Sequence, residues 1–241
     1  MNEPNSRNVS KDFVYCMNSK KFIFDVFYQR IVNCNDSDSD YSRVELLFRP
    51  RGSLTTGSVE EFYNTLNLNN KCLTDFTINQ LKYLMLHSEA LCEKFDEISI
   101  NIELVSVEGC FDYLIELDKV LSKQGSKLTV EITERNNEQL SNFSGILKKL
   151  NGIKISLDDL MLKCQNIDLL LSNFPMVRQI KIDTRDYTFL DMVEIVNSCV
   201  MNNIEVVIER IQSSNMKYHG LNGVLFQSFN FHHPKLLKLT G

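Results

Sequence analysis

The stretch Gly152–Lys163, GIKISLDDLMLK, joins a strand pattern to two adjacent acids, Asp158 and Asp159. Apolar residues alternate with polar ones up to the acids, as in a strand with one buried face. One explanation is a helix N-terminus, because Asp caps free N–H groups and its charge suits the helix dipole. The other explanation is metal binding, which requires further acids nearby.

Similar β-rich runs recur along the chain and alternate with longer amphipathic runs. The predicted strands are residues 21–32, 43–50, 97–104, 127–133, 153–159, 178–183, 204–209 and 223–229. The predicted helices are residues 59–67, 74–95, 109–125, 137–151, 164–174 and 190–203. This alternation predicts an α/β fold with a parallel sheet. Eight strands favour a closed TIM-type (β/α)₈ barrel, with a doubly wound sheet as the alternative.

Composition narrows the class of protein. The chain has 241 residues, 43% of them hydrophobic, with nine Gly and four Pro, which predicts one barrel domain, placed over residues 21–241. The opening run MNEPNSRNVSKDF is polar, so we expect a short polar segment over residues 1–20. The net charge of −5 gives no electrostatic reason to expect nucleic-acid binding, which usually shows as a basic face. Seven Cys without a CxxC pair indicate neither a zinc site nor a disulfide framework, and fit a reducing cytoplasm. No apolar run approaches the roughly 20 residues of a membrane span, so we expect a cytoplasmic protein without a membrane partner.

Polar residues stand at the carboxyl ends of the predicted strands, where a barrel carries its chemistry. Each acid alone is more often a solvated residue or half of an ion pair. Acids that converge on one barrel mouth repel each other unless cations neutralise them, and an oxygen-only set suits Mg²⁺, Mn²⁺ or Ca²⁺ better than zinc. Adjacent acids suit two metal ions that share one carboxylate. The residues are Glu45, Arg49, Asn101, Glu131, Glu134, Asp158, Asp159, Lys181, Asp183 and Glu209.

The order of the motifs VEL…R, NI, EITE, DD, KID and VIE resembles the EAL-domain family of cyclic di-GMP phosphodiesterases. The resemblance runs from about Phe22 to Pro234. It implies a modified TIM barrel whose first strand is antiparallel. It also implies hydrolysis of one phosphodiester bond of cyclic di-GMP, which gives linear pGpG and lowers the level of this second messenger of bacterial motility and biofilm control.

The resemblance also assigns roles to single residues. It implies two Mg²⁺ or Mn²⁺ ions, with Asp158 shared between them, and a lysine that orients or deprotonates the attacking water. The implied metal ligands are Glu45, Asn101, Glu131, Asp158 and Asp159, the catalytic residues are Lys181, Glu45 and Glu209, the substrate contacts are Arg49, Gln29 and Asn222, and Glu134 supports a loop.

Two departures from the family pattern keep a second hypothesis open. After the paired acids, LMLKCQ has no glycine where the family has Phe-Gly-Thr-Gly, and in IERIQ Arg210 replaces a glycine. The alternative is therefore a degenerate EAL protein that does not hydrolyse cyclic di-GMP but binds it, or binds a regulatory protein partner. A homodimer is compatible with either. The FHHP run at residues 231–234 is predicted to be a surface turn.

Overall fold

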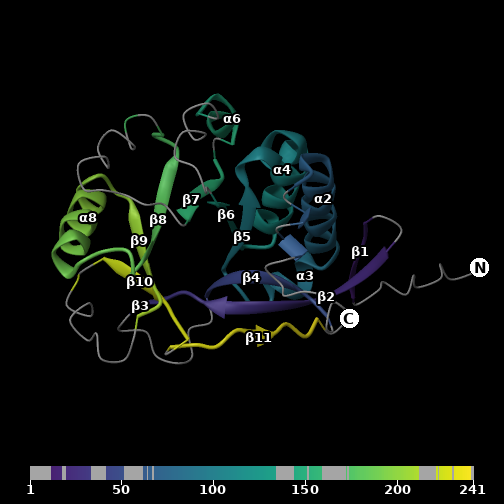
Figure 1. Cartoon of the computed structure of the whole chain (residues 1–241), viewed down its shortest axis with the longest axis horizontal. Coiled ribbons are helices and arrows are strands. Elements are labelled where there is room, and N and C mark those ends of the chain that lie inside the picture. Colours follow the sequence, from purple (N-terminus) through teal and green to yellow (C-terminus); the bar gives the residue numbers. More distant parts are fainter. Residues whose placement is uncertain are drawn as a thin grey trace, which may run out of the picture.

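Among the residues that it describes, the computed structural model has an 11-stranded sheet that closes into a barrel, with helices outside it (Figure 1). The structure describes residues 12–17, 20–33, 42–51, 62–63, 65–66, 68–133, 144–150, 152–158, 172, 174–211, 221, 223–229 and 231–239. The strands are β1 (Phe13–Met17), β2 (Lys20–Arg30), β3 (Val32–Asn33), β4 (Arg43–Pro50), β5 (Glu97–Glu103), β6 (Lys127–Thr133), β7 (Lys154–Asp158), β8 (Val177–Asp183), β9 (Glu205–Glu209), β10 (Val224–Gln227) and β11 (Lys235–Leu236). The helices are α2 (Asn70–Leu86), α3 (Ser88–Cys92), α4 (Val107–Lys123), α6 (Ser144–Lys149) and α8 (Phe189–Met201), with a 3₁₀ turn at η1 (Leu104–Ser106).

The strand order confirms the predicted modified TIM barrel. Strands β4 to β10 follow one another in parallel register, whereas β2 pairs antiparallel with β4. The segment that contains β2 continues into β3, which pairs antiparallel with β10 and so closes the barrel. The first barrel strand is thus the antiparallel one. Two further strands, β1 and β11, pair with β2 from outside this circle.

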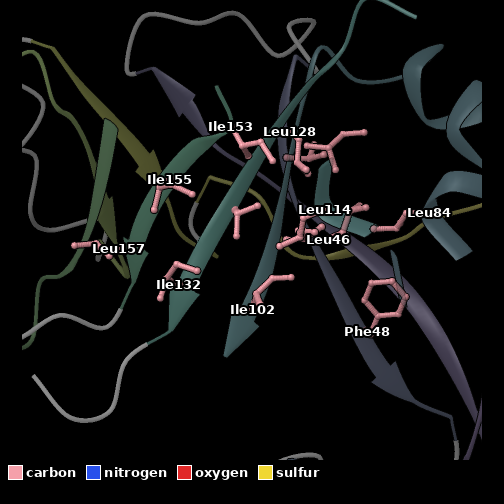
Figure 2. Close-up of a cluster of buried hydrophobic side chains, with 14 of the residues drawn as sticks. Leu46, Phe48, Leu84, Ile102, Leu114, Leu128, Ile132, Ile153, Ile155 and Leu157 are labelled. Carbon is pink, nitrogen blue, oxygen red and sulfur yellow. The ribbon is translucent and has the colours of Figure 1, made fainter. Parts of the chain in front are cut away.

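In β5, β6 and β7, alternation along the strand separates apolar residues outside the barrel from polar residues inside it. In β5, Ile98, Ile100 and Ile102 are buried against the helices, while Ser99 and Asn101 belong to the other face. Figure 2 shows the apolar set, with Ile102, Ile132 and Leu157 on neighbouring strands and Leu84 and Leu114 on helices. Ordinary TIM barrels fill their interior with bulky branched side chains. Here the interior is polar, which leaves it available for chemistry.

Helices α2 and α4 pack side by side outside β5 and β6, and α8 lies against β9 (Figure 1). Asn69 caps α2 by accepting from two backbone N–H groups, and Thr188 and Asp191 form a capping box at α8. The approach of α2 to α4 is close at Gly109, where an added Cβ would lie 2.5 Å from Cγ2 of Thr74. The predicted helix at 74–95 is split at His87 into α2 and α3.

The amino ends of the strands carry an ionic cluster that fills the bottom of the barrel. Arg43 contacts Glu205 at 2.9 Å and Glu97 at 3.4 Å. Lys154 bridges the same two acids, with 2.6 Å between Nζ and Oε1 of Glu97. Thr129 donates to that Glu97 oxygen at 2.7 Å. Each charge in this cluster has an opposite partner, so the cluster is a structural base for the barrel.

Strand β1 falls inside the segment predicted for residues 1–20, and the boundary between that segment and the barrel domain stays a prediction. Among the described residues, none of the helices has the length and apolar character that crossing a membrane requires.

Candidate active site

The candidate site lies at the carboxyl ends of the barrel strands, around the ammonium of Lys181. Lys181 projects inward from β8, and its side chain is 1% exposed. Buried lysines are rare unless they are paired, because removing the charge from water is costly. The carboxyl ends of the neighbouring strands supply that pairing.

Four carboxylates from four strands surround this ammonium. The Nζ atom lies 2.9 Å from Oε2 of Glu131 and 2.9 Å from Oε1 of Glu209. It lies 3.3 Å from Oε2 of Glu45 and 3.7 Å from Oδ1 of Asp158. These acids come from β6, β9, β4 and β7, so the closed barrel is what brings them together.

Two amide side chains also donate hydrogen bonds to the Glu45 carboxylate. Asn101 Nδ2 donates to its Oε1, and Gln227 Nε2 donates to its Oε2. Gln227 Nε2 also lies 3.5 Å from Oε1 of Gln29, whose own amide donates to the carbonyl of His232 at 3.3 Å. The network therefore runs around the barrel from β5 through β4 to β10 and β2, which fixes the rotamer of Glu45.

The buried charges in the network shift one another's pKa values. Burial raises the pKa of Glu131 to about 7, with Glu45 and Glu209 adding to the effect and Lys181 opposing it. Burial, with the same neighbouring acids, raises the pKa of Asp158 well above its usual value against the pull of Lys181. For Glu45, burial raises the pKa, but Lys181 and the two amide donors outweigh burial and lower it.

The pKa of Lys181 is raised well above its usual value, because the four carboxylates outweigh the effect of burial. The side chain is therefore an ammonium at neutral pH. An ammonium can donate hydrogen bonds and stabilise negative charge, but it cannot take a proton from water. In this state of the site, Lys181 can act as a hydrogen-bond donor but not as a base.

Whether this network suits a metal ion depends on which of its oxygen atoms lack a hydrogen-bond donor. Within the described ranges, no three His, Cys, Asp or Glu side chains are arranged as a metal site of their own, since the acids gather around Lys181. However, Asn101 Oδ1 and Glu131 Oε1 are buried acceptors without a hydrogen-bond donor among the described residues, and these two residues face each other across β5 and β6. A buried acceptor without a partner is costly. Two such neighbouring oxygens fit the donor set of a hard divalent cation.

A pocket of about 710 Å³ opens above the network. Glu45, Asp158, Lys181 and Glu209 contribute to its floor, whereas Glu131 lies deeper in the barrel. Arg49 lies in the pocket wall with an exposed side chain. The volume lies within the range of small-molecule sites, about 300–1,000 Å³.

The barrel brings most of the predicted site residues into one network. Those joined by the contacts above are Gln29, Glu45, Asn101, Glu131, Asp158, Lys181 and Glu209. Arg49 shares the pocket with them but stands apart from the buried network. The predictions for Asp159, Glu134 and Asn222 fall on positions outside the described residues.

Sequence reasoning missed Gln227 and His232. Gln227 is the polar residue that ends the eighth strand, so the rule that found the other site residues would have found it as well. The prediction of a surface turn at 231–234 is wrong for His232, which is buried and accepts from the Arg30 backbone N–H through Nδ1 at 3.4 Å. No local signal marks that burial, because it depends on β11 returning along β2.

No protein-family model matches the sequence, and no curated protein matches it. Among solved structures, the FimX EAL domain of Xanthomonas citri in complex with c-diGMP matches with a TM-score of 0.69 and 15% identity, over 90% of this chain and 91% of that one. The manganese/cy-diGMP complex of Klebsiella pneumoniae BlrP1 matches with a TM-score of 0.66 and 20% identity, over 94% of this chain and 59% of that one. The cGMP-bound form of the EAL enzyme Bd1971 matches with a TM-score of 0.66 and 21% identity, over 88% of this chain and 62% of that one.

These likenesses establish the fold, which is that of an EAL domain. This chain spans less than two thirds of the length of two of these structures, with 59% of BlrP1 and 62% of Bd1971 covered.

Proposed function

We propose that this chain binds cyclic di-GMP in the pocket above Lys181 and, with Mg²⁺ or Mn²⁺, hydrolyses one phosphodiester bond to give linear pGpG. The observation that carries the proposal is the buried network of Lys181 and four carboxylates at the mouth of an EAL-type barrel. The FimX and BlrP1 structures of the same fold contain the cyclic dinucleotide, and the BlrP1 structure contains manganese as well.

The residues that would hold the cations are Glu45, Asn101, Glu131 and Asp158, with Asp159 as a further proposed ligand. A bound divalent cation supplies positive charge that polarises the phosphoryl group and activates water. Mg²⁺ and Mn²⁺ both favour the oxygen donors present here. A second cation would share Asp158.

In this proposal, side chains of the pocket orient the water, accept its proton and hold the phosphate. The reaction forms a bond from water oxygen to phosphorus and breaks the bond from phosphorus to the ribose 3′ oxygen. Lys181 orients the water and offsets the charge that develops on the phosphoryl oxygens. Glu209 is the most exposed of the four acids around Lys181, at 15%, and for that reason we assign it the role of accepting the proton of the water. Arg49 holds a phosphate oxygen through its guanidinium.

A second candidate function is a receptor that binds the dinucleotide without cleaving it. The observation that favours it is the position of Lys181, which occupies the point on which the acids converge, together with the absence of a three-acid metal site among the described residues. In a receptor, the ammonium would permanently take the place of the cation.

One experiment separates the two functions. Purified protein is titrated with cyclic di-GMP by calorimetry, and a parallel sample with Mg²⁺ or Mn²⁺ is resolved by chromatography. Binding with accumulation of pGpG supports the hydrolase. Binding without product under either metal supports the receptor, and no binding at all contradicts both.

A further inference from the structure

Two arginines at the mouth of the pocket share one buried acid. Arg185 and Arg210 both line the pocket whose floor contains Lys181. Arg185 Nη2 lies 2.7 Å from Oδ2 of Asp183, and Arg210 Nε lies 3.2 Å from the same oxygen. Arg185 Nε also donates to Oδ1 of Asp183, at 3.1 Å.

The shared acid fixes both guanidinium groups while leaving them accessible. The Asp183 side chain is 6% exposed, whereas Arg185 and Arg210 are 63% and 57% exposed. Burial raises the pKa of Asp183, but Arg185 and then Arg210 outweigh it, so the pKa is lowered and the acid stays ionised at neutral pH. Asp183 follows Lys181 on the inner face of β8, so it positions the arginine pair beside the catalytic floor.

The backbone at Arg210 is an independent sign that this side chain has a function. Its φ is 54°, in the left-handed region that L-residues other than Asn and Asp rarely adopt. Glycine would take this conformation at little cost. Its carbonyl accepts from the Thr184 hydroxyl at 3.2 Å, which ties the end of β9 to the loop after β8. Unfavourable backbone conformations of this kind concentrate at binding and catalytic sites.

The pair presents accessible, positively charged donors to the pocket. Both guanidinium groups line the pocket and are more than half exposed, so a ligand bound there can contact them. Guanidinium groups match phosphate oxygens in geometry as well as in charge.

We propose that Arg185 and Arg210, fixed by Asp183, bind the phosphodiester group of the cyclic dinucleotide that is not being hydrolysed. This inference rests on the proposed function and adds a second phosphate site to it. A cyclic dinucleotide carries two phosphates. Lys181 and Arg49 are assigned to the phosphate that reacts, and Arg185 and Arg210 are the further cationic side chains that line the same pocket, available to the second phosphate.

The test measures the affinity for a hydrolysis-resistant phosphorothioate analogue of cyclic di-GMP in Mg²⁺, so that turnover does not interfere. Arg185→Ala and Arg210→Gly should each weaken binding about tenfold. Asp183→Asn should also weaken binding, although it retains both arginines, because it releases their fixed geometry. The matched control is Arg178→Ala at the other end of β8, where the guanidinium donates to the backbone carbonyls of Pro175 and Val177.

A second dinucleotide analogue distinguishes phosphate binding from guanine recognition, and the binding of the wild-type protein separates this proposal from the proposed function. The same losses with the cyclic di-AMP analogue support phosphate binding, whereas losses confined to cyclic di-GMP overturn it in favour of guanine recognition. Melting curves show whether each variant is folded, and the loss should shrink at high salt as charges are screened. If the wild-type protein binds but both arginine variants keep its affinity, the arginine pair is refuted while the proposed function stands. If the wild-type protein binds neither dinucleotide, both fall.

Discussion

The Lys181 ammonium lies 2.9 Å from the Glu131 carboxylate, and both side chains are at most 1% exposed. Such a pair is costly to break, because removal of one partner leaves the other as a buried charge. Lys181→Met leaves the four acids without their cation, and should lower the free energy of unfolding by about 3–5 kcal/mol in the absence of divalent ions.

Divalent ions should reverse much of that loss. A cation that binds only the folded protein stabilises it by mass action. Mg²⁺ or Mn²⁺ should therefore raise the melting temperature of Lys181→Met by more than that of the wild-type protein, since the ion no longer competes with the ammonium. Thermal melts with and without the ion measure both shifts. Equal shifts would mean that the ion and the ammonium do not share the same acids.

The metal proposal makes a separate prediction for Glu131. Glu131→Gln removes a proposed ligand and should reduce the rise in melting temperature that Mg²⁺ or Mn²⁺ gives the wild-type protein. Glu97→Gln is the matched control, because Glu97 is also a buried acid paired with a lysine, but at the opposite end of the barrel. The control variant should keep the full shift. A melting temperature that millimolar ions do not move in the wild-type protein would argue against an assembled metal site.

The ionic cluster at the amino ends of the strands should make stability depend on pH. Burial raises the pKa of Glu205, but Lys154 and then Arg43 outweigh burial and lower it. A lowered pKa in the folded state gives stability that is complete above the usual value of about 4.3 and is lost as the pH falls through the lowered value.

The comparison of the wild-type protein with Glu205→Gln tests this dependence. In urea unfolding from pH 7 to pH 3, the variant should be less stable at pH 7, and the difference should shrink below pH 4. Glu194→Gln, an exposed change on α8, serves as the control. A difference that stayed constant with pH would assign the effect of Glu205 to packing.

The contact between α2 and α4 gives a prediction about packing. Gly109→Ala places a Cβ 2.5 Å from Cγ2 of Thr74 and should destabilise the protein by about 1–3 kcal/mol, despite the better helix propensity of Ala. Thr74→Ser removes that Cγ2. The double variant should recover the loss, and denaturant unfolding of the four proteins gives the coupling energy. Independent, additive effects would show that the two helices adjust without this contact.

The strand pattern predicted the barrel well, because polar and apolar residues alternate clearly in β5, β6 and β7, and short β-rich runs mark the other barrel strands. Strand β1 was not predicted, because its five residues lie in a segment expected to be polar and form a strand by pairing with β2. The convergence of the acids was predicted from their place at the ends of strands.

What the sequence did not predict are relationships that depend on barrel closure or on backbone conformation. Gln227 reaches Glu45 because β10 closes against the first strand, far away in the sequence. The sharing of Asp183 by Arg185 and Arg210 depends on the left-handed backbone at Arg210. Residue type alone carries neither signal.

We propose that Lys181 and its acids form a hydrolytic site. The rate of pGpG formation from cyclic di-GMP with Mg²⁺ or Mn²⁺ tests this directly when the wild-type protein, Lys181→Met and Lys154→Met are compared. Lys154 also bridges acids inside the barrel, but at the end away from the pocket. We expect product from the wild-type protein and from folded Lys154→Met, and a loss of at least about 10²-fold in Lys181→Met. A folded wild-type protein that binds cyclic di-GMP and forms no pGpG with either metal would contradict the proposal.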